Sequence, residues 1–377
     1  MDLVVVESGA KAKTIQKYLG KNILVKASNG HVQDLPNKGK DGSKALWSYK
    51  KKDLPEPPWS WTERSEKHIK SIISESRRKK VDRVLIATDP DREGEFIAWR
   101  LGELLSEFGD IQRITFNEIT ESAIKEALKA AGSVDMNLVD AAKVRRFMDR
   151  LIGYRASRFS RSWSLSSMGR VQTPTLGFVV KREKEIQNFV STPYWAVQAI
   201  ASGIDFRVRF HEKDDSSVWK DEKGKIDIHR TNDSDLANKA YEYLNLESQI
   251  TPQKVSLNNY KRRPKPPFTT DTLLQATGSK YSWRPSNTMR IAQGLYEAGH
   301  ITYMRTDSTR TSNSSREKAK EFVTSKWGSD HVGKGALGGK PKSGVQDAHE
   351  AIRPTNPQSE LPNGLDDSQR RLYNLIW

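Results

Sequence analysis

Apolar and polar residues alternate along the chain with periods that change from one segment to the next. An apolar run at 3–6 is followed by a glycine turn and then by a helical pattern that ends at Gly20. A second strand of the buried type is predicted at 84–88, and a helix at 96–105 comes after it. Because strands and helices alternate here, we expect a parallel or mostly parallel sheet.

Residues 34–67 interrupt this pattern, because they are rich in Lys, Gly, Pro and Trp. We interpret them as a long excursion from the sheet. The chain is helical in pattern and strongly basic from 121 to 190.

The pattern of apolar and polar residues changes at 191–262. Apolar residues occupy every second position at 204–210, which predicts a β-strand, and Ser202 and Gly203 predict a hairpin turn before it. We therefore expect a small β-rich domain here, which the basic proline linker 261–267 connects to the rest of the chain.

The last third of the chain is helical again. Ser286 is expected to cap a helix that Gly299 ends. Its apolar stripe includes Met289, Ala292, Leu295 and Tyr296.

Residues 324–346 hold six glycines and predict a mobile loop. The helical pattern at 366–377 ends on apolar residues. An apolar helix left exposed at the chain end would indicate a cut chain, and we expect another element to cover this face.

Charge and composition narrow the class of partner. The 377 residues include 63 Lys and Arg against 47 Asp and Glu, so the formal net charge is +16 and the pI is near 9.7. Such a charge predicts a polyanionic partner, either nucleic acid or an anionic membrane surface. No run approaches about 18 apolar residues, the N-terminus lacks a signal-peptide pattern, and cysteine is absent. We therefore expect no membrane span, no disulfide and no thiolate site, in a nucleic-acid-binding protein of the cytoplasm.

Four carboxylates are expected at one edge of the predicted sheet. Glu7 ends the first strand, and Asp89, Asp91 and Glu93 follow the second one within D-P-D-R-E-G-E. Open α/β sheets place ligand sites at this edge, and clustered carboxylates repel one another unless a hard cation lies among them. The pattern predicts that these four residues bind Mg²⁺, with Lys11 on a phosphate oxygen. A solvated acidic turn and an exposed lysine are the alternatives.

No Walker motif is present. The one candidate, Gly339-Lys340, is followed by Pro341 and lacks the earlier glycine. Nucleotide hydrolysis of the P-loop kind, and a nucleotide cofactor, are therefore not expected.

Three segments resemble motifs of a known family. V-V-V-E-S-G-A-K-A-K-T-I and A-T-D-P-D-R-E-G-E-F-I-A-W are similar to the Toprim domain of type IA DNA topoisomerases, a fold that primases and some nucleases also have. H-I-T-Y-M-R-T-D-S at 300–308 resembles the tyrosine motif of the same family over its whole length. Met304 is typical of bacterial topoisomerase I, whereas the topoisomerase III branch usually has proline there.

The resemblance implies that Tyr303 is the nucleophile. Its attack on a DNA phosphodiester would form a transient 5′-phosphotyrosine, a bond of similar energy to the one broken, so resealing would need no ATP. Arg305 is two residues on and would point to the same side of an extended segment, where it can stabilise charge on the phosphorus.

The remaining catalytic roles also come from the resemblance. Glu7 would protonate the leaving 3′ oxygen with the help of Lys11, while Asp89 and Asp91 would carry the magnesium. Q-D-A-H-E-A-I-R-P-T at 346–355 is similar to a further family motif, which places His349 near the scissile phosphate.

Other segments resemble parts of the family that contact DNA. Within 145–154, Arg146, Arg150 and Tyr154 recur on one helix face, which suits a single strand; an exposed basic face is the alternative. The predicted DNA-binding residues are His31, Arg145, Arg146, Asp149, Arg150, Tyr154, Ser167, Met168, Gly169, Arg170, Val171, Gln172, Thr173 and Arg305. We interpret Trp59 and Trp61 as core or rim residues.

Nearly the whole chain is covered by the resemblance, which implies a multidomain α/β plus α plus β fold, the toroidal core of a topoisomerase. We expect a Rossmann-like Toprim domain at 1–120, a helical single-strand DNA-binding domain at 121–190, a β-rich arch at 191–262, and a helical, tyrosine-bearing domain at 263–377. In the family the chain then returns through the arch and the helical domain, and zinc ribbons often follow. We expect the arch to be incomplete here, and a separate C-terminal polypeptide is a candidate partner that would complete the ring.

The implied function is ATP-independent, Mg²⁺-dependent relaxation of negatively supercoiled DNA, by cutting one strand, passing a strand and resealing the cut. The substrate is single-stranded or underwound DNA of the nucleoid. Two alternatives remain open. An inactive fragment that only binds single-stranded DNA would not depend on Tyr303. A Toprim nuclease or primase would depend on Asp89 and Asp91 and form no covalent intermediate.

Overall fold

The computed structural model describes the chain at 1–35, 59–63, 65–221, 224–247, 249, 251, 255–260, 264–333 and 349–377. Two compact units make up the chain: Met1–Arg170 together with Arg262–Trp377, and Val171–Lys261. Most of the predicted excursion at 34–67, most of the glycine-rich segment 324–346 and the start of the proline linker lie outside the described residues.

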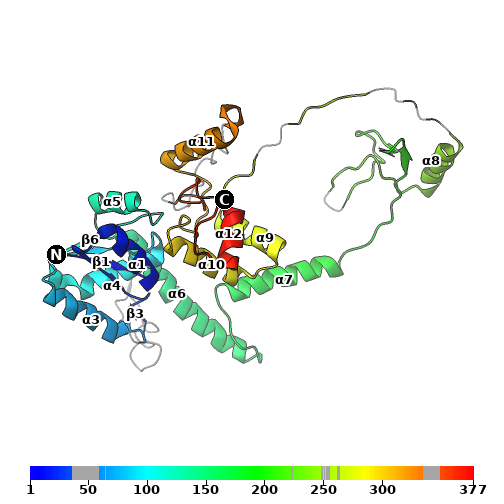
Figure 1. Ribbon diagram of the computed structural model, residues 1–377. Coiled ribbons are helices and arrows are strands. Elements are labelled where there is room, and N and C mark those ends of the chain that lie inside the picture. Colours follow the sequence, from blue (N-terminus) through cyan, green and yellow to red (C-terminus); the bar gives the residue numbers. More distant parts are fainter. Residues whose placement is uncertain are drawn as a thin grey trace. The chain divides into compact units, whose positions relative to one another are not determined.

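A four-stranded parallel sheet lies in the N-terminal part of the first unit (Figure 1). Its strand order is β2-β1-β5-β6, with bounds Ile23–Ala27 for β2, Asp2–Val6 for β1, Arg83–Ile86 for β5 and Asp110–Arg113 for β6. Leu3 to Val6 are fully buried, because β1 has a neighbour on each edge and packed helices on each face. The predicted parallel sheet is therefore confirmed.

The two faces of this sheet belong to two separate cores. Leu3 and Val5 of β1 pack in the core that includes α3 and α4, and Val4 and Val6 pack in the core that includes α1 and α5. These helices are α1 (Gly9–Leu19), α3 (Ser65–Arg78), α4 (Arg92–Leu104) and α5 (Glu121–Lys129). Alternate residues of one strand thus hold helices on opposite sides of the sheet.

The C-terminal third of the chain shares the core of Val4 and Val6. Leu273, Ile291 and Leu372 belong to this cluster, and so does Tyr303. They come from α9 (Thr270–Tyr281), α10 (Pro285–Glu297), α12 (Asp367–Ile376) and the segment after α10, while α11 (Asn313–Trp327) buries no side chain. Packing against one core therefore fixes the tyrosine segment relative to the sheet.

The helix α10 agrees with its predicted stripe but not with its predicted cap. Ala292, Leu295 and Tyr296 are buried, as expected for one apolar face. The helix begins at Pro285, one residue before Ser286, and its N-cap is Arg284, which makes no side-chain capping bond. Proline fits the first helical position because it has no N–H to satisfy there, and this decided where the helix starts.

The expectation that another element covers the apolar face at 366–377 is confirmed, while Trp377 at its end is 41% exposed. Leu372, Tyr373 and Ile376 of α12 are buried, and α12 packs against α10. Asp366 caps the helix through a reciprocal capping box with Gln369. The apolar stripe looked unpartnered because its partner, α10, lies far away in the sequence.

Further elements of the first unit are the long helix α6 (Met136–Arg161), the antiparallel pair β3 (Gln33–Asp34) and β4 (Ser60–Trp61), and single 3-10 turns at Ser106–Phe108 and Ser329–His331. Across the described residues, no helix is both long enough and apolar enough to cross a membrane.

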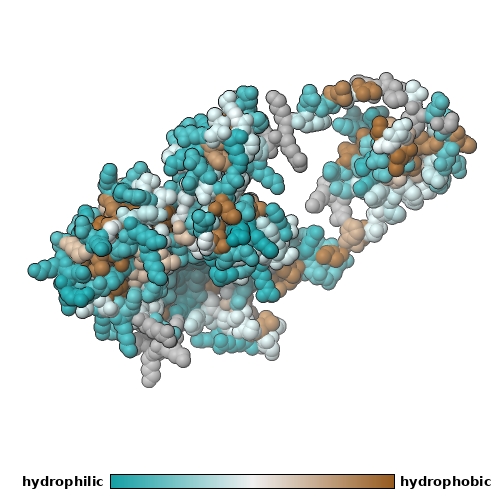
Figure 2. Space-filling view, in the orientation of Figure 1, coloured by the Kyte–Doolittle hydropathy of each residue, from teal (hydrophilic) through white to brown (hydrophobic). Residues whose placement is uncertain are grey.

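The second unit contains the predicted β-hairpin. Strands β7 (Gln198–Ala201) and β8 (Ile204–Arg207) pair antiparallel, and Ser202 and Gly203 between them both have positive φ, as a two-residue type I′ turn requires. The strand is shorter than predicted. This unit also holds α7 (Gln172–Gln187), which buries none of its side chains, and α8 (Ser234–Leu246). Apolar side chains consequently lie open on it, as the brown surface in Figure 2 shows.

Candidate active site

Glu7 and Asp89 meet where two neighbouring strands end. Glu7 directly follows β1 and Asp89 follows β5, and these strands are parallel, so their carboxyl ends share one edge. The backbone N–H of Asp89 donates to Glu7 Oε1 over 2.9 Å. Lys11, from the first turns of α1, forms a buried ion pair with Asp89. Lys11 is thus a buried counter-ion of the carboxylates, and the exposed-lysine alternative is excluded.

The acidic segment after β5 forms the start of α4 rather than a loop. Asp91 is the N-cap, and its Oδ1 accepts from Gly94 N over 2.8 Å, so the helix begins at Arg92 and not at 96 as predicted. A side chain at Gly94 would place its Cβ 2.0 Å from the carbonyl oxygen of Asp89. The glycine therefore allows the helix to start this close to the strand.

Tyr303 reaches this acidic edge from the other part of the unit. Its hydroxyl donates to Asp91 Oδ2 over 2.6 Å, and its side chain is only 2% exposed. Arg305 Nη1 lies 3.9 Å from the same oxygen, so Tyr303 and Arg305 share one side of the segment, as the sequence predicts. The backbone N–H groups of Tyr303 and of the residue before it are both hydrogen-bonded. Tyr303 N donates to Asn117 O over 2.8 Å, and Thr302 N donates to Arg353 O over 2.9 Å.

Burial and charge set the protonation states of the site. Burial and, next, the nearby charge of Asp89 raise the pKa of Glu7 to about 7. Burial, together with Asp89 and Asp91, raises the pKa of the Tyr303 phenol far above its usual value. At neutral pH the site therefore holds a protonated tyrosine and a Glu7 that can both give and take a proton.

His349 also lies at the tyrosine. Its ring centroid is 5.7 Å from that of Tyr303, and its side chain is buried, which lowers the pKa of the imidazole. The Nδ1 atom has no hydrogen-bond partner in the described part of the chain. The first residues of its motif, 346–348, lie outside that part.

Glu93 does not join the other carboxylates. Its Oε2 accepts from Arg146 over 2.7 Å and lies 3.3 Å from His31 Nε2, and these partners lower its pKa to about 2. Arg145 Nη1 is 3.4 Å from its other oxygen. The predicted four-carboxylate cluster is therefore not formed, because α4 begins at Arg92 and turns Glu93 toward α6. Within the described ranges, no three acidic or histidine side chains are placed to hold a metal ion.

The predicted DNA-binding residues of α6 contact different parts of the first unit. The Arg146 side chain is 15% exposed and lies 2.6 Å from Asp34, so it joins the helix to the sheet domain. Arg150 lies over the ring of Tyr154, which is half exposed. Asp149 pairs with Arg170 over 2.6 Å, so the motif at 145–154 meets the motif that starts at 167.

The segment 167–170 folds back on α6. Met168 N donates to Ser157 Oγ over 3.0 Å, and that hydroxyl donates to Met168 O over 3.1 Å. Ser167 and Gly169 flank this contact, and the motif then continues as Val171, Gln172 and Thr173 in the second unit, where α7 begins. The binding of DNA by these residues stays a prediction.

Sequence reasoning did not single out three residues that shape the site. Arg113 and Glu95 form a buried ion pair of 2.7 Å, and Arg113 also donates to Asp89 O over 2.9 Å, which fixes the loop carrying the carboxylates. Tyr296 was predicted only as a core residue, but its ring lies 5.3 Å from that of Tyr303 and under the ammonium of Lys11. The signal for Arg113 was its place in a strand-like segment between Ile111 and Ile114. Trp59 packs on Phe96, in agreement with a core position.

A parallel sheet with acidic residues at its carboxyl edge, and a buried tyrosine that bonds to that edge, define a Toprim protein with an attached tyrosine domain. Comparison with protein families agrees: residues 2–119 match the Toprim domain, and residues 133–377 match the DNA topoisomerase family. The chain belongs to the type IA DNA topoisomerases. Its fold is similar to that of full-length topoisomerase I from Thermotoga maritima, with 33% sequence identity and a TM-score of 0.72. That match covers 100% of this chain and 59% of the Thermotoga chain.

Proposed function

We propose that this chain cuts one strand of DNA by attack of Tyr303 Oη on a phosphodiester, and that it reseals the strand by the reverse reaction. The hydrogen bond from the Tyr303 hydroxyl to Asp91 is the observation that carries this proposal. It joins the nucleophile to the acidic edge of the Toprim sheet, across a sequence separation that no local pattern determines.

Side chains of this protein account for every proton transferred in the cleavage step. The Tyr303 oxygen forms a bond to phosphorus, and its proton passes to the Asp91 carboxylate that already accepts it. The bond from phosphorus to the 3′ oxygen breaks, and Glu7, whose pKa is about 7, supplies the proton to that oxygen. Arg305 and Lys11 are the cations that stabilise charge on the phosphate. The product is a 5′-phosphotyrosine, which a free 3′ hydroxyl can reverse without ATP.

Three of the four predicted carboxylates are the candidate ligands of Mg²⁺, although in the described part of the chain they are not placed as a three-residue metal site. Glu7, Asp89 and Asp91 lie at one edge. Burial and, next, the charge of Asp89 raise the pKa of Glu7, and a cation bound here would favour its ionised form. Glu93 is excluded by its pairs with His31 and Arg146. When bound, Mg²⁺ would stabilise the negative charge of the phosphate oxygens.

DNA is the proposed substrate. The net charge of +16 and the arginines of α6 favour a polyanion, and the exposed face of Tyr154 suits the stacking of a base. Because Tyr303 is buried, we propose that the tyrosine segment moves away from the sheet edge to admit a strand. The relaxation of negative supercoils and a location at the nucleoid are parts of the same proposal.

The test is to trap the covalent intermediate. The protein is mixed with Mg²⁺ and single-stranded oligonucleotides labelled at the 5′ or the 3′ end, and detergent stops the reaction. Only the 3′ label should migrate with the protein, because phosphotyrosine holds the downstream fragment. Tyr303→Phe should abolish this adduct, whereas Tyr241→Phe, at a 58% exposed site on α8, should not change it.

Two results would contradict the proposal. Binding of the strand without any adduct would identify a protein that only binds single-stranded DNA. Metal-dependent cleavage that persists in Tyr303→Phe would identify a nuclease instead.

A further inference from the structure

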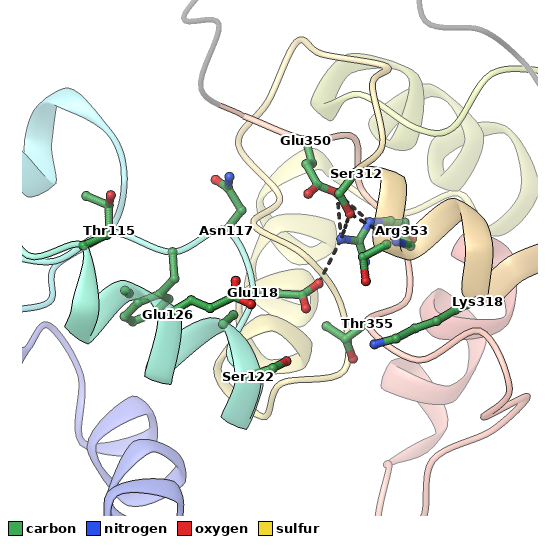
Figure 3. Close-up of a pocket in the computed structure, with 16 residues that line it drawn as sticks. Thr115, Asn117, Glu118, Ser122, Glu126, Ser312, Lys318, Glu350, Arg353 and Thr355 are labelled. Carbon is green, nitrogen blue, oxygen red and sulfur yellow. Dashed lines mark hydrogen bonds and ion pairs between the residues drawn. The ribbon is translucent and has the colours of Figure 1, made fainter.

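A cavity of about 500 Å³ lies where the Toprim part and the tyrosine part of the first unit meet (Figure 3). Glu118 and Ser122 line it from the Toprim side, and Ser312, Lys318 and Arg353 line it from the tyrosine side. We call this boundary the seam. It adjoins the active site, because Asn117, which also lines the cavity, accepts the backbone N–H of Tyr303.

Arg353 makes an ion pair that crosses the seam at this cavity. Its Nη2 atom lies 2.9 Å from Glu118 Oε2 and 2.6 Å from Glu350 Oε2, and its Nε donates to Glu350 over 2.7 Å. The Arg353 and Glu118 side chains are 9% and 19% exposed. The contact with Glu118 is an electrostatic pair without the alignment of a hydrogen bond. Charges that are largely shielded from water interact more strongly than surface pairs do.

These contacts close a ring around the tyrosine segment. Tyr303 N bonds to Asn117 O, Thr302 N bonds to Arg353 O, and the Arg353 side chain returns to Glu118, the residue after Asn117. The Thr302 hydroxyl adds a bond of 2.7 Å to Ala351 O. The segment 302–303 is therefore held between two strips of backbone, and the Arg353–Glu118 pair ties those strips together.

We propose that Arg353 is a positioning residue for Tyr303. Through Glu118 it holds the segment 302–303 against the Toprim part, at the place where the tyrosine hydroxyl meets Asp91. The proposal rests on the proposed function for the role of Tyr303 in cleavage. How the segment is held does not depend on that function, and hydrogen exchange of its backbone amides measures it without any cleavage reaction.

Glu118→Gln is the informative variant. It removes the charge that faces Arg353 but leaves Glu350 as a counter-ion, so no buried cation is left unpaired and the fold is expected to survive. Lys318→Gln is the matched control, because it changes the charge of the same cavity on an exposed residue of α11 and leaves the Arg353–Glu118 pair intact.

Hydrogen exchange measures the position of the segment without any activity. Glu118→Gln should speed the exchange of the Thr302 and Tyr303 amides about tenfold, a shift well within the range of local opening. Exchange in β1 should stay as in the wild type, which distinguishes local release from general destabilisation. Lys318→Gln should leave both regions unchanged.

The rate of adduct formation with the 3′-labelled oligonucleotide measures the consequence. We expect about a tenfold loss in Glu118→Gln and none in Lys318→Gln, since small displacements of a nucleophile are costly. The proposal is overturned if exchange at Thr302 and Tyr303 is unchanged in Glu118→Gln. It is also overturned if exchange speeds up while the adduct rate is unchanged, or if the rate falls without faster exchange.

Failure of the proposed function gives a different result. If the wild-type protein forms no adduct, the cleavage reaction is refuted. The exchange data then decide by themselves whether Arg353 and Glu118 hold the tyrosine segment.

Discussion

Glu7→Gln offers a quantitative test of the electrostatics of the site. The Glu7 carboxyl is ionised only at a cost, because it is largely buried and lies beside Asp89, and its pKa rises from 4.5 to about 7. Such a rise means that ionising Glu7 costs about 3 kcal/mol more in the folded protein than in the unfolded protein. Glutamine keeps an oxygen that can accept the Asp89 N–H but never carries the charge. The variant should therefore be more stable than the wild type wherever Glu7 is ionised.

The sign of the pH dependence follows from the two pKa values. Below about pH 4.5 Glu7 is protonated in the folded and the unfolded protein, so the substitution changes little. Between about pH 4.5 and 7 only the folded protein keeps the proton, and the stability of the wild type relative to the variant falls as the pH rises. Above about pH 7 the folded protein carries the whole penalty, and the variant should be more stable by about 1 to 3 kcal/mol.

Urea unfolding of both proteins at about pH 4.5 and about pH 8.5, without divalent cations, measures this difference. Glu121→Gln, at a 57% exposed side chain, is the control and should change stability by less than about 0.5 kcal/mol at either pH. Equal effects of Glu7→Gln at the two pH values would refute the reasoning. Added Mg²⁺ should stabilise the wild type more than the variant at the higher pH.

Two further substitutions test the buried polar groups around the site. Tyr296→Phe should raise the free energy of unfolding by about 1 kcal/mol, because the hydroxyl is fully buried without a hydrogen-bond partner among the described residues. A lower melting temperature in this variant would contradict that. Glu95→Gln should cost about 3 to 5 kcal/mol in urea unfolding, since it leaves Arg113 buried without its counter-charge. A loss below about 1 kcal/mol would show that the pair does not hold the loop. Glu66→Gln, at a 47% exposed side chain that pairs with an exposed lysine, is its control.

Local patterns were sufficient for several elements of the fold. The period of apolar residues predicted β1, β5, the helices α1 and α10 and the hairpin of the second unit, because these periods reflect which side of an element is buried. The resemblance of short motifs to one family identified Tyr303 and the acidic segment. Errors were made at the ends of elements, as at Ser286, where the geometry of one proline decided the cap.

Long-range packing decided which charges meet. The spacing D-P-D-R-E-G-E suggested that Glu93 belongs with Asp89 and Asp91. Capping by Asp91 starts the helix early, and Glu93 then faces Arg146 and His31. An N-cap is a local feature, but the charged partners of a helix face come from distant segments that no local period determines.

The sequence by itself determined the periods, the charge and the chemical types of the site residues. Only the tertiary structure decided that the Tyr303 hydroxyl bonds to Asp91, that Arg353 pairs with Glu118, and that α12 covers α10. The reason is physical. Secondary structure follows from interactions within a few residues, whereas these contacts depend on how the two faces of one sheet are filled by helices from both ends of the first unit.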